Sequence, residues 1–196
     1  MAGGLRIVGG SWSGRRLESP PRIRPSTERT REALFSIWQG RVPGARFLDA
    51  FCGSGAAGLE ALSRGASSAV LVDADARVLE VAARNRDRLE ARGCTTVRLE
   101  LPRGLASPRL RGEVFDLVFA DPPYDFVDLT GLLAALEPHL APDGEIALEH
   151  AAGVEAPRAV AGLRLTESRR YGGSVLSFYR RQDSETDCSR NEASSR

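Results

Sequence analysis

The residues with the clearest chemical potential are Asp121-Pro122-Pro123-Tyr124, which directly follow an apolar run from Phe115 to Ala120. Proline lacks a backbone N–H and cannot continue a central strand. Two prolines in succession therefore predict that the chain leaves a sheet here in a stiff, extended turn. Such a turn holds a carboxylate, the Pro122 carbonyl and a phenol ring in a fixed arrangement. These groups suit a planar ligand that carries an NH2 group, because both oxygens accept hydrogen bonds.

A second group of candidate residues lies between a predicted strand and a predicted helix. Gly53, Gly55 and Gly58 have the G-x-G-x-x-G spacing, in which glycine lets the backbone approach a ligand closely at a helix N-terminus. The spacing alone suits a nicotinamide or flavin enzyme as well. Asp49, at the end of the preceding strand, would repel a pyrophosphate and attract the ammonium of a methionine moiety. Asp73 ends the next strand and is placed to accept hydrogen bonds from ribose hydroxyls, a role that both cofactor classes require.

The elements that must position these residues alternate between strands and helices. At the front of the chain, the pattern predicts a hairpin from 5–8 and 15–18 and a helix that begins after Ser26 and ends at Gly40. The strands that follow are predicted at 46–50, 69–73, 95–99, 115–120 and 145–149, with two final strands at 163–169 and 175–180. Helices are predicted between them at 57–64, 76–92 and 129–140, with a short helix within 103–110. Alternation of this kind predicts a mostly parallel sheet with helices on both faces and an antiparallel C-terminal edge. The first and fourth strands of a doubly wound sheet are neighbours, and ligands bind at their carboxyl ends. The glycine loop and the tetrapeptide are therefore expected to face one another.

Together the two groups indicate methyl transfer from S-adenosylmethionine to nitrogen. An exocyclic amine on a nucleobase is a poor nucleophile because its lone pair is delocalised into the ring. If Asp121 accepts one N–H and the Pro122 carbonyl accepts the other, the lone pair is directed toward the methyl donor, and Asp121 can take the released proton. Tyr124 would stack on or border an unpaired or flipped-out base. The tetrapeptide alone does not distinguish guanine from adenine.

Positive charge is concentrated at the front of a chain whose formal net charge is only +1. Residues 1–46 contain nine Arg against three Glu, which gives this segment a net charge of +6 (9 − 3). Planar guanidinium groups suit phosphate oxygens, so the clustering predicts an RNA-phosphate surface. The candidate residues are Arg15, Arg16, Arg22, Arg24, Arg29 and Arg31. A solvated surface strip is the alternative that composition leaves open.

Length and composition predict one main domain in a cytoplasmic protein. The 196 residues are 42% hydrophobic, no stretch has the length of a membrane span, and the N-terminus lacks the order of a secretory signal. Cys52, Cys94 and Cys188 are odd in number and widely spaced, so neither disulfides nor a metal site are expected. The polar segment 182–196 is expected to be a disordered tail.

Several segments also match the motifs of one family. They are Arg6-Ile7-Val8-Gly9-Gly10, 24–27 with 31–35, 49–55 with 58–66, 121–124 and Tyr171-Gly172. Through them the chain, over about residues 5–181, resembles the RsmD-type bacterial 16S rRNA guanine-N2 methyltransferases. The resemblance implies a Rossmann-like class I methyltransferase dependent on S-adenosylmethionine, with a mostly parallel seven-stranded sheet. The expected organisation is an RNA-binding hairpin at 1–22, the methyltransferase domain at 23–181 and the tail.

The resemblance also implies a substrate and a cofactor site. The substrate would be the N2 amine of guanine 966 in 16S rRNA, on assembled or nearly assembled small subunits, and the enzyme is expected to be a monomer. The expected cofactor-binding residues are Asp49, Phe51, Gly53, Ser54, Gly55 and Asp73, and Asp121, Pro122, Pro123 and Tyr124 would form the catalytic site. Many class I methyltransferases have an acid after the third strand that reads the adenine amine. Glu100 is the candidate for that role here.

Two other functions remain as alternatives. An adenine-N6 methyltransferase would use a similar amine-binding turn, but it would be expected to carry a separate target-recognition domain. A non-catalytic RNA-binding assembly factor with a methyltransferase fold is the other alternative. The combination of Asp49, Asp73 and Asp121 argues against it, because a module without catalysis has no need for all three carboxylates.

Overall fold

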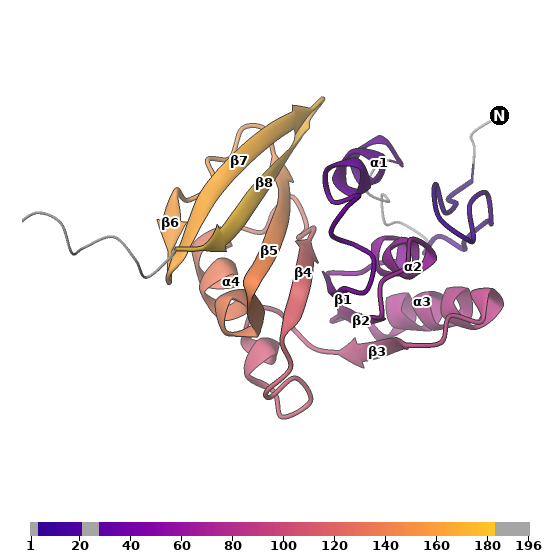
Figure 1. The fold of residues 1–196 in the computed structure, drawn as a ribbon. Helices are drawn as coiled ribbons and strands as arrows, with labels where there is room; N and C mark the ends of the chain where they lie inside the picture. The colour runs from indigo at the N-terminus through magenta and orange to yellow at the C-terminus, as the bar shows by residue number, and fades with distance from the viewer. Residues whose placement is uncertain (1–3, 21–27, 183–196) are drawn as a thin grey trace, which may run out of the picture.

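The structure, a computed structural model, describes residues 4–20 and 28–182. Its centre is an eight-stranded sheet with the order β3-β2-β1-β4-β5-β8-β7-β6 (Figure 1). The strands are β1 (Arg46–Ala50), β2 (Ser68–Asp73), β3 (Cys94–Arg98), β4 (Phe115–Ala120), β5 (Leu140–Ala151), β6 (Ala159–Val160), β7 (Leu163–Tyr171) and β8 (Ser174–Arg181). Strands β1 to β5 pair in parallel, and β6 to β8 form an antiparallel edge. This is the Rossmann-like fold predicted from the alternation, with one strand more than the seven expected.

Helices cover both faces of the sheet. Helices α1 (Glu28–Ile37), α2 (Ala56–Ser63) and α3 (Ala76–Leu89) pack on one face, and α4 (Leu129–Leu136) packs on the other with the short 3-10 turns η1 (Arg103–Ala106) and η2 (Glu137–His139). The side chains of a strand point alternately to the two faces. Phe47 of β1 accordingly joins the core beneath α1, α2 and α3, and Leu48 joins the core beneath α4. The near-continuous apolar character of β1 and β4 therefore reflects burial on both faces.

Strands β1 and β4 are neighbours at the point where the strand order reverses. Asp49 is paired with Phe119, and Ala50 is paired with Ala120, so both strands end at the same level. The loop after β1 contains the glycines, and the loop after β4 is the Asp121–Tyr124 turn. A doubly wound sheet binds its ligands at this crevice, because the chain leaves these two strands in opposite directions.

Some element boundaries differ from the sequence prediction for local reasons. Strand β5 begins at Leu140 rather than residue 145, and the two-residue strand β6 was not predicted. The helix expected within 103–110 is only the single turn η1. Helix α3 ends at Leu89, before the expected stop at Gly93, because Glu90 adopts the left-handed conformation with φ 52° and donates its N–H to carbonyls of the last turn. A non-glycine residue thus performs the capping that glycine was predicted to perform.

The N-terminal segment, residues 4–20, is held by both α2 and α3, and on the α3 side the Glu18 N–H donates to Asn85 Oδ1 at 2.7 Å. The two arms of the expected hairpin pair in antiparallel fashion through the bridge between Arg6 and Arg16 and through backbone hydrogen bonds such as Ile7 N–H to the Arg15 carbonyl at 3.0 Å, although neither arm forms a regular strand. The Ser26 cap of α1 lies outside the described residues. The Val8 N–H donates to Glu60 at 3.3 Å, and the Trp12 N–H donates to Ser63 Oγ at 2.9 Å. The apolar side chains of the segment, Ile7 and Leu17, are buried in the core shared with the helices. The segment therefore contributes to the core of the main body.

Candidate active site

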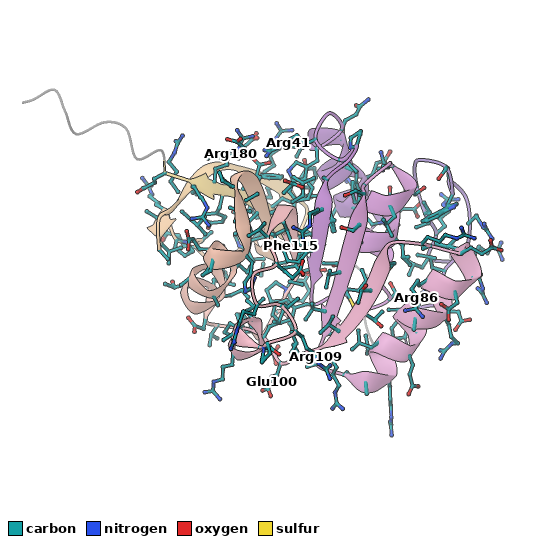
Figure 2. All side chains as sticks on the ribbon, turned by 60° about the horizontal axis from the view of Figure 1, so that its bottom comes forward. Arg41, Arg86, Glu100, Arg109, Phe115 and Arg180 are labelled. Atoms are coloured by element: carbon teal, nitrogen blue, oxygen red, sulfur yellow. The ribbon has the colours of Figure 1, made fainter. Side chains whose placement is uncertain are left out.

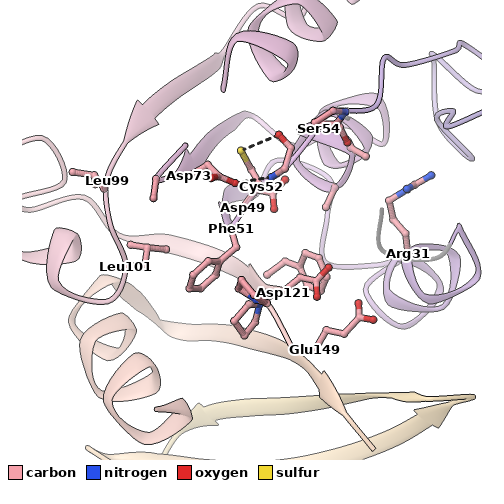
Figure 3. Close-up of a pocket in the computed structure, with 18 of the residues that line it drawn as sticks. Arg31, Asp49, Phe51, Cys52, Ser54, Asp73, Leu99, Leu101, Asp121 and Glu149 are labelled. Atoms are coloured by element: carbon pink, nitrogen blue, oxygen red, sulfur yellow. Dashed lines mark hydrogen bonds between the residues drawn. The ribbon is translucent and has the colours of Figure 1, made fainter. Parts of the chain in front are cut away.

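A cavity of about 490 Å³ opens where β1, β2, β4 and β5 end, at the edge of the sheet that the topology marks as the ligand side (Figure 3). Its size is typical of small-molecule sites. The lining includes residues that the sequence singled out: Asp49, Phe51, Gly53, Ser54, Asp73, Glu100, Asp121, Pro122, Pro123 and Tyr124. Ser19 and Pro20 also line it, so the N-terminal segment borders the cavity. One cavity thus brings together the glycine loop and the tetrapeptide.

The glycine loop turns sharply between β1 and α2. Phe51 adopts φ 66°, a left-handed conformation that is uncommon for a bulky residue, and the Gly53 N–H donates to Asp73 Oδ2 at 3.1 Å. Gly55 does not line the cavity, contrary to its predicted place in the cofactor site. It begins α2 with φ 77°, and a Cβ there would lie 2.8 Å from Leu71. Gly55 is therefore required for close packing of the helix on β2.

The carboxylates at the strand ends make the cavity strongly acidic. Asp49 is only 2% exposed, and its Oδ2 accepts the Gly58 N–H at 2.8 Å. Burial raises the pKa of Asp49 well above its usual range, the Gly58 hydrogen bond opposes this, and the charges of Asp121 and Asp73 raise it further. Asp73 accepts the Asp75 N–H through its other oxygen at 3.0 Å. A cationic group in the cavity would relieve the repulsion between these acids, whereas a pyrophosphate would increase it.

The Asp121–Tyr124 turn remains anchored to the neighbouring strand. The Asp121 N–H donates to the Ala50 carbonyl at 3.3 Å, so the turn stays beside the start of the glycine loop. Pro122 is buried, whereas the Tyr124 side chain is 61% exposed at the mouth of the cavity. The Tyr124 hydroxyl lies 3.2 Å from Ser174 Oγ at the start of β8. The aromatic ring is thus held at the entrance by its hydroxyl, with its carbon surface open to solvent.

The far side of the cavity is mainly apolar. Leu99 and Leu101, which follow β3, line it together with Phe51, whose ring packs edge-on against Phe126 with centroids 5.6 Å apart. Glu100 between the two leucines is exposed and lies at the surface beyond β3 (Figure 2). A flat apolar ligand group fits between these side chains. The sequence had drawn attention to Glu100 alone, because a leucine at a strand end carries no chemical signal.

Two further charged residues line the cavity and were not predicted to do so. Glu149 is 3% exposed and comes from the end of β5, beside Asp121 (Figure 3). Arg31 of α1 is 2% exposed, and its Nε donates to Glu60 Oε2 at 2.8 Å. The residue after Glu149, His150, lies buried with Nε2 2.9 Å from Ser177 Oγ. The parallel register of β4 and β5 would have identified Glu149, since it pairs Ala120 with Leu148.

Comparison with known proteins identifies the family to which the chain belongs. The family described as "Conserved hypothetical protein 95" matches residues 5–180, which is nearly the whole of the described chain. The chain belongs to this family. It is the RsmD-type methyltransferase family that the sequence motifs resemble, so that resemblance is confirmed.

Individual relatives of this RsmD-type methyltransferase match it in sequence and in structure. YlbH of Bacillus subtilis is 33% identical over 183 residues, which cover 91% of this chain and 100% of YlbH. Ribosomal RNA small subunit methyltransferase D of Escherichia coli is 41% identical over 125 residues, covering 63% of this chain and 62% of that protein. The solved structure of yhhF from Escherichia coli superposes with a TM-score of 0.81 at 35% identity, over 92% of this chain and 99% of that one.

The predicted RNA-binding arginines of this RsmD-type methyltransferase do not form one uniform set. Arg15, Arg16 and Arg29 are exposed, whereas Arg22 and Arg24 lie outside the described residues. The prediction for Arg31 is wrong, because its guanidinium is buried against Glu60 and is not available to a phosphate at the surface. The sequence could not show this, since the partner that allows burial lies on another helix.

Two other basic residues, at the opposite end of the sheet, are paired with a carboxylate. Arg41 and Arg180 lie side by side, and both contact Glu145, at 3.2 Å and 2.5 Å (Figure 2).

Across residues 4–20 and 28–182, no group of three or more His, Cys, Asp or Glu side chains is arranged to hold a metal ion. Nor does any helix in the same ranges have the length and apolar character needed to cross a membrane.

Proposed function

We propose that this chain transfers a methyl group from S-adenosylmethionine to the exocyclic N2 amine of guanine 966 in 16S rRNA, on assembled or nearly assembled small ribosomal subunits in the cytoplasm. The observation that carries the proposal is the single cavity in which the Asp121–Tyr124 turn faces the glycine loop and its acids. Methyltransferase activity follows from the family. The choice of guanine rests on the resemblance of the motifs to the RsmD type.

The cavity fits S-adenosylmethionine by the chemistry of its lining. Asp49 would hold the cationic amino group, Asp73 would accept from the ribose hydroxyls, and Leu99, Leu101 and Phe51 would enclose the adenine. The bound cofactor supplies an electrophilic methyl group on a sulfonium sulfur. The acidity of the cavity supports this cation over a dinucleotide, whose pyrophosphate would meet the charges of Asp49, Asp73 and Asp121.

The residues of the turn would prepare the amine for attack. The Asp121 carboxylate accepts one N–H and the Pro122 carbonyl accepts the other, which orients the nitrogen lone pair out of the plane of the ring. Asp121 can take the proton that the amine releases, and the exposed ring of Tyr124 offers a surface on which the extruded base stacks. Positioning would supply most of the rate, because the amine is weakly nucleophilic and the reaction needs no covalent intermediate with the enzyme.

The proposal is tested by methylation of unmodified small subunits. The protein is incubated with isotopically labelled S-adenosylmethionine and subunits that lack the modification, and the rRNA nucleosides are analysed by mass spectrometry. We expect labelled N2-methylguanosine. Labelled N6-methyladenosine would contradict the guanine assignment. A protein that gains no thermal stability at saturating cofactor would contradict dependence on S-adenosylmethionine, because ligand at 100 times its Kd stabilises by about 2.7 kcal/mol.

We propose that the front of the chain binds rRNA phosphates through its exposed arginines. The double substitution Arg15→Ala/Arg16→Ala is expected to weaken binding of small subunits and to reduce the slope of log K against log salt by roughly 1 to 2, since each phosphate contact contributes just under 1. Affinity for S-adenosylmethionine should not change. The matched control is Arg109→Ala/Arg111→Ala, two exposed arginines between η1 and β4. Equal changes of slope in both double variants would show that general charge is responsible.

A further inference from the structure

Glu149 combines three features that a purely structural carboxylate does not need. It is 3% exposed, it lines the cavity, and within residues 4–20 and 28–182 its Oε2 atom has no hydrogen-bond partner. A buried carboxylate oxygen without a partner is costly, so such an atom is expected to bind something that enters the cavity. Figure 3 shows Glu149 next to Asp121, on the side of the cavity away from Leu99 and Leu101. The oxygen is therefore close to the proposed amine-binding turn and remote from the apolar wall.

We propose that Glu149 binds the N1–H group of the target guanine and thereby selects guanine over adenine. This inference rests on the proposed function, because it concerns the base that occupies the amine-binding turn. Guanine presents two neighbouring kinds of donor on one edge, the N1–H and the N2 amine. Adenine presents an amine beside N1, which is an acceptor. Two neighbouring carboxylates match the guanine edge, whereas an ionised Glu149 would meet the N1 lone pair of adenine.

The pairing of the strands fixes the two carboxylates beside each other. Strand β5 runs parallel to β4 with Leu148 opposite Ala120, so Glu149, near the end of β5, lies at the level where Asp121 follows β4. A rigid pair of strand ends can distinguish bases more sharply than a mobile loop, because a wrong base cannot be accommodated by a shift of the acceptor. A site built to accept from an N–H group strongly rejects an analogue that lacks it, because the buried acceptor is then left unpaired.

The groups around Glu149 set the pH range in which its carboxylate is ionised and can accept a hydrogen bond from guanine N1–H. Burial and, to a smaller extent, the charge of Asp121 raise the pKa of Glu149 to about 7, and a hydrogen bond with Ser174 opposes both. The other titratable side chains that line the cavity are Arg31, Asp49, Cys52, Asp73, Glu100 and Tyr124, and the Arg31 guanidinium is paired with Glu60. Glu149 is therefore ionised above about pH 7, where it accepts from guanine N1–H. Below that pH it is protonated and can donate to an unprotonated N1.

The test uses a base that keeps the reacting amine and changes only the edge that Glu149 reads. Small subunits are reconstituted with 16S rRNA that carries either guanine or 2-aminopurine at the target position. The 2-aminopurine base retains the N2 amine but has an acceptor at N1 and lacks the O6 atom. The wild-type protein is expected to prefer guanine by at least ~10²-fold in kcat/KM at pH 8. Glu149→Gln has the same shape and an amide N–H that can donate to N1, so it should prefer guanine by less than about 10-fold.

The control variant is Glu155→Gln, which changes an exposed glutamate in the loop after β5 and should leave the wild-type preference intact. The pH dependence gives a second readout that requires no variant. Toward guanine, kcat/KM should fall about tenfold per pH unit below pH 7, and the guanine preference should fall with it. Glu149→Gln should lose this dependence.

The outcomes separate this inference from the function on which it rests. If the wild-type protein forms no N2-methylguanosine on guanine subunits, the proposed function fails. If it does, an unchanged guanine preference in Glu149→Gln, or a wild-type preference that stays constant between about pH 5.5 and 8.5, overturns the role of Glu149 alone. If Glu149→Gln fails to fold, the pH dependence of the wild-type guanine preference still tests the proposed role of Glu149.

Discussion

Asp121→Ala is expected to reduce kcat for methyl transfer by at least roughly 10²- to 10³-fold while the affinity for S-adenosylmethionine stays near the wild-type value. The reduction is that seen when one pre-positioned hydrogen-bonding group is removed from an active site. Asp121 belongs to the proposed base-binding side of the cavity, next to Tyr124, whereas Asp49 and Asp73 surround the proposed cofactor side. The change should therefore act on the chemical step rather than on cofactor binding.

Single-turnover kinetics on unmodified small subunits measure this prediction directly, because they separate chemistry from product release. Cofactor affinity is followed in parallel by thermal shift. Asp125→Ala is the matched control, since it removes an exposed aspartate four positions later that does not line the cavity. Near-normal turnover of Asp121→Ala would refute the mechanism. Loss of cofactor binding together with turnover would instead assign Asp121 to the cofactor side.

Asp121→Asn gives a sharper test of how the carboxylate acts. The amide keeps one acceptor oxygen but turns an N–H donor toward an amine that is itself a donor. We therefore expect Asp121→Asn to recover little of the lost rate. A rate close to wild type would mean that a single acceptor is enough and that Asp121 does not take the proton.

The central part of the fold could be predicted because its local signals agree. Strands β1 and β4 begin and end where the sequence predicted, since each is a short apolar run bounded by a polar or proline-containing turn. Their adjacency followed from the topology of doubly wound sheets, and it brought Asp49 and Asp121 to one cavity. The two-residue strand β6 has no periodicity of its own, so only its pairing with β7 defines it.

The parts of the site that the sequence did not reveal depend on contacts between distant segments. Arg31 appears as one of several front arginines until Glu60 is found beside it. Glu149 appears as the last residue of an apolar strand until the register of β4 and β5 is known. Both are charged residues whose burial is decided by a partner elsewhere in the chain. Composition and periodicity describe only the residue's own segment, and they favour the exposed interpretation.

Two motifs that carried the family resemblance are in contact with each other. A Cβ on Gly9 would lie 2.3 Å from the Arg64 guanidinium, and one on Gly10, with φ 81°, would lie 2.0 Å from the Ser63 carbonyl oxygen. The segment from Arg6 to Gly10 thus packs directly on the end of α2. At Gly10 there is no space for a side chain, because the nearest atoms belong to the α2 backbone, whereas at Gly9 the nearest atoms belong to the flexible end of Arg64.

Glu60→Ala is expected to lower the free energy of unfolding by roughly 3–5 kcal/mol, because it leaves a buried guanidinium without a counter-ion. Glu60 is 0% exposed. It accepts from Arg31 at 2.8 Å, from Arg64 at 2.7 Å and from the Val8 N–H at 3.3 Å. Its loss therefore affects α1, α2 and the N-terminal segment together. Urea unfolding measures the change, and Glu80→Ala, an exposed glutamate on α3, should stay within about 0.5 kcal/mol of wild type.

A double-mutant cycle distinguishes loss of the ion pair from loss of packing. Arg31→Met removes the guanidinium that Glu60→Ala would leave unpaired, so the double variant should lose less stability than the two single changes added together. Arg64 does not cancel this effect, because its side chain is 23% exposed and can be solvated once Glu60 is gone. Additive losses would show that Glu60 acts mainly by filling space. A coupling of 1 kcal/mol or more, roughly the range for contacting residues, would identify the Arg31–Glu60 pair as the link between α1 and the helix that begins at the glycine loop.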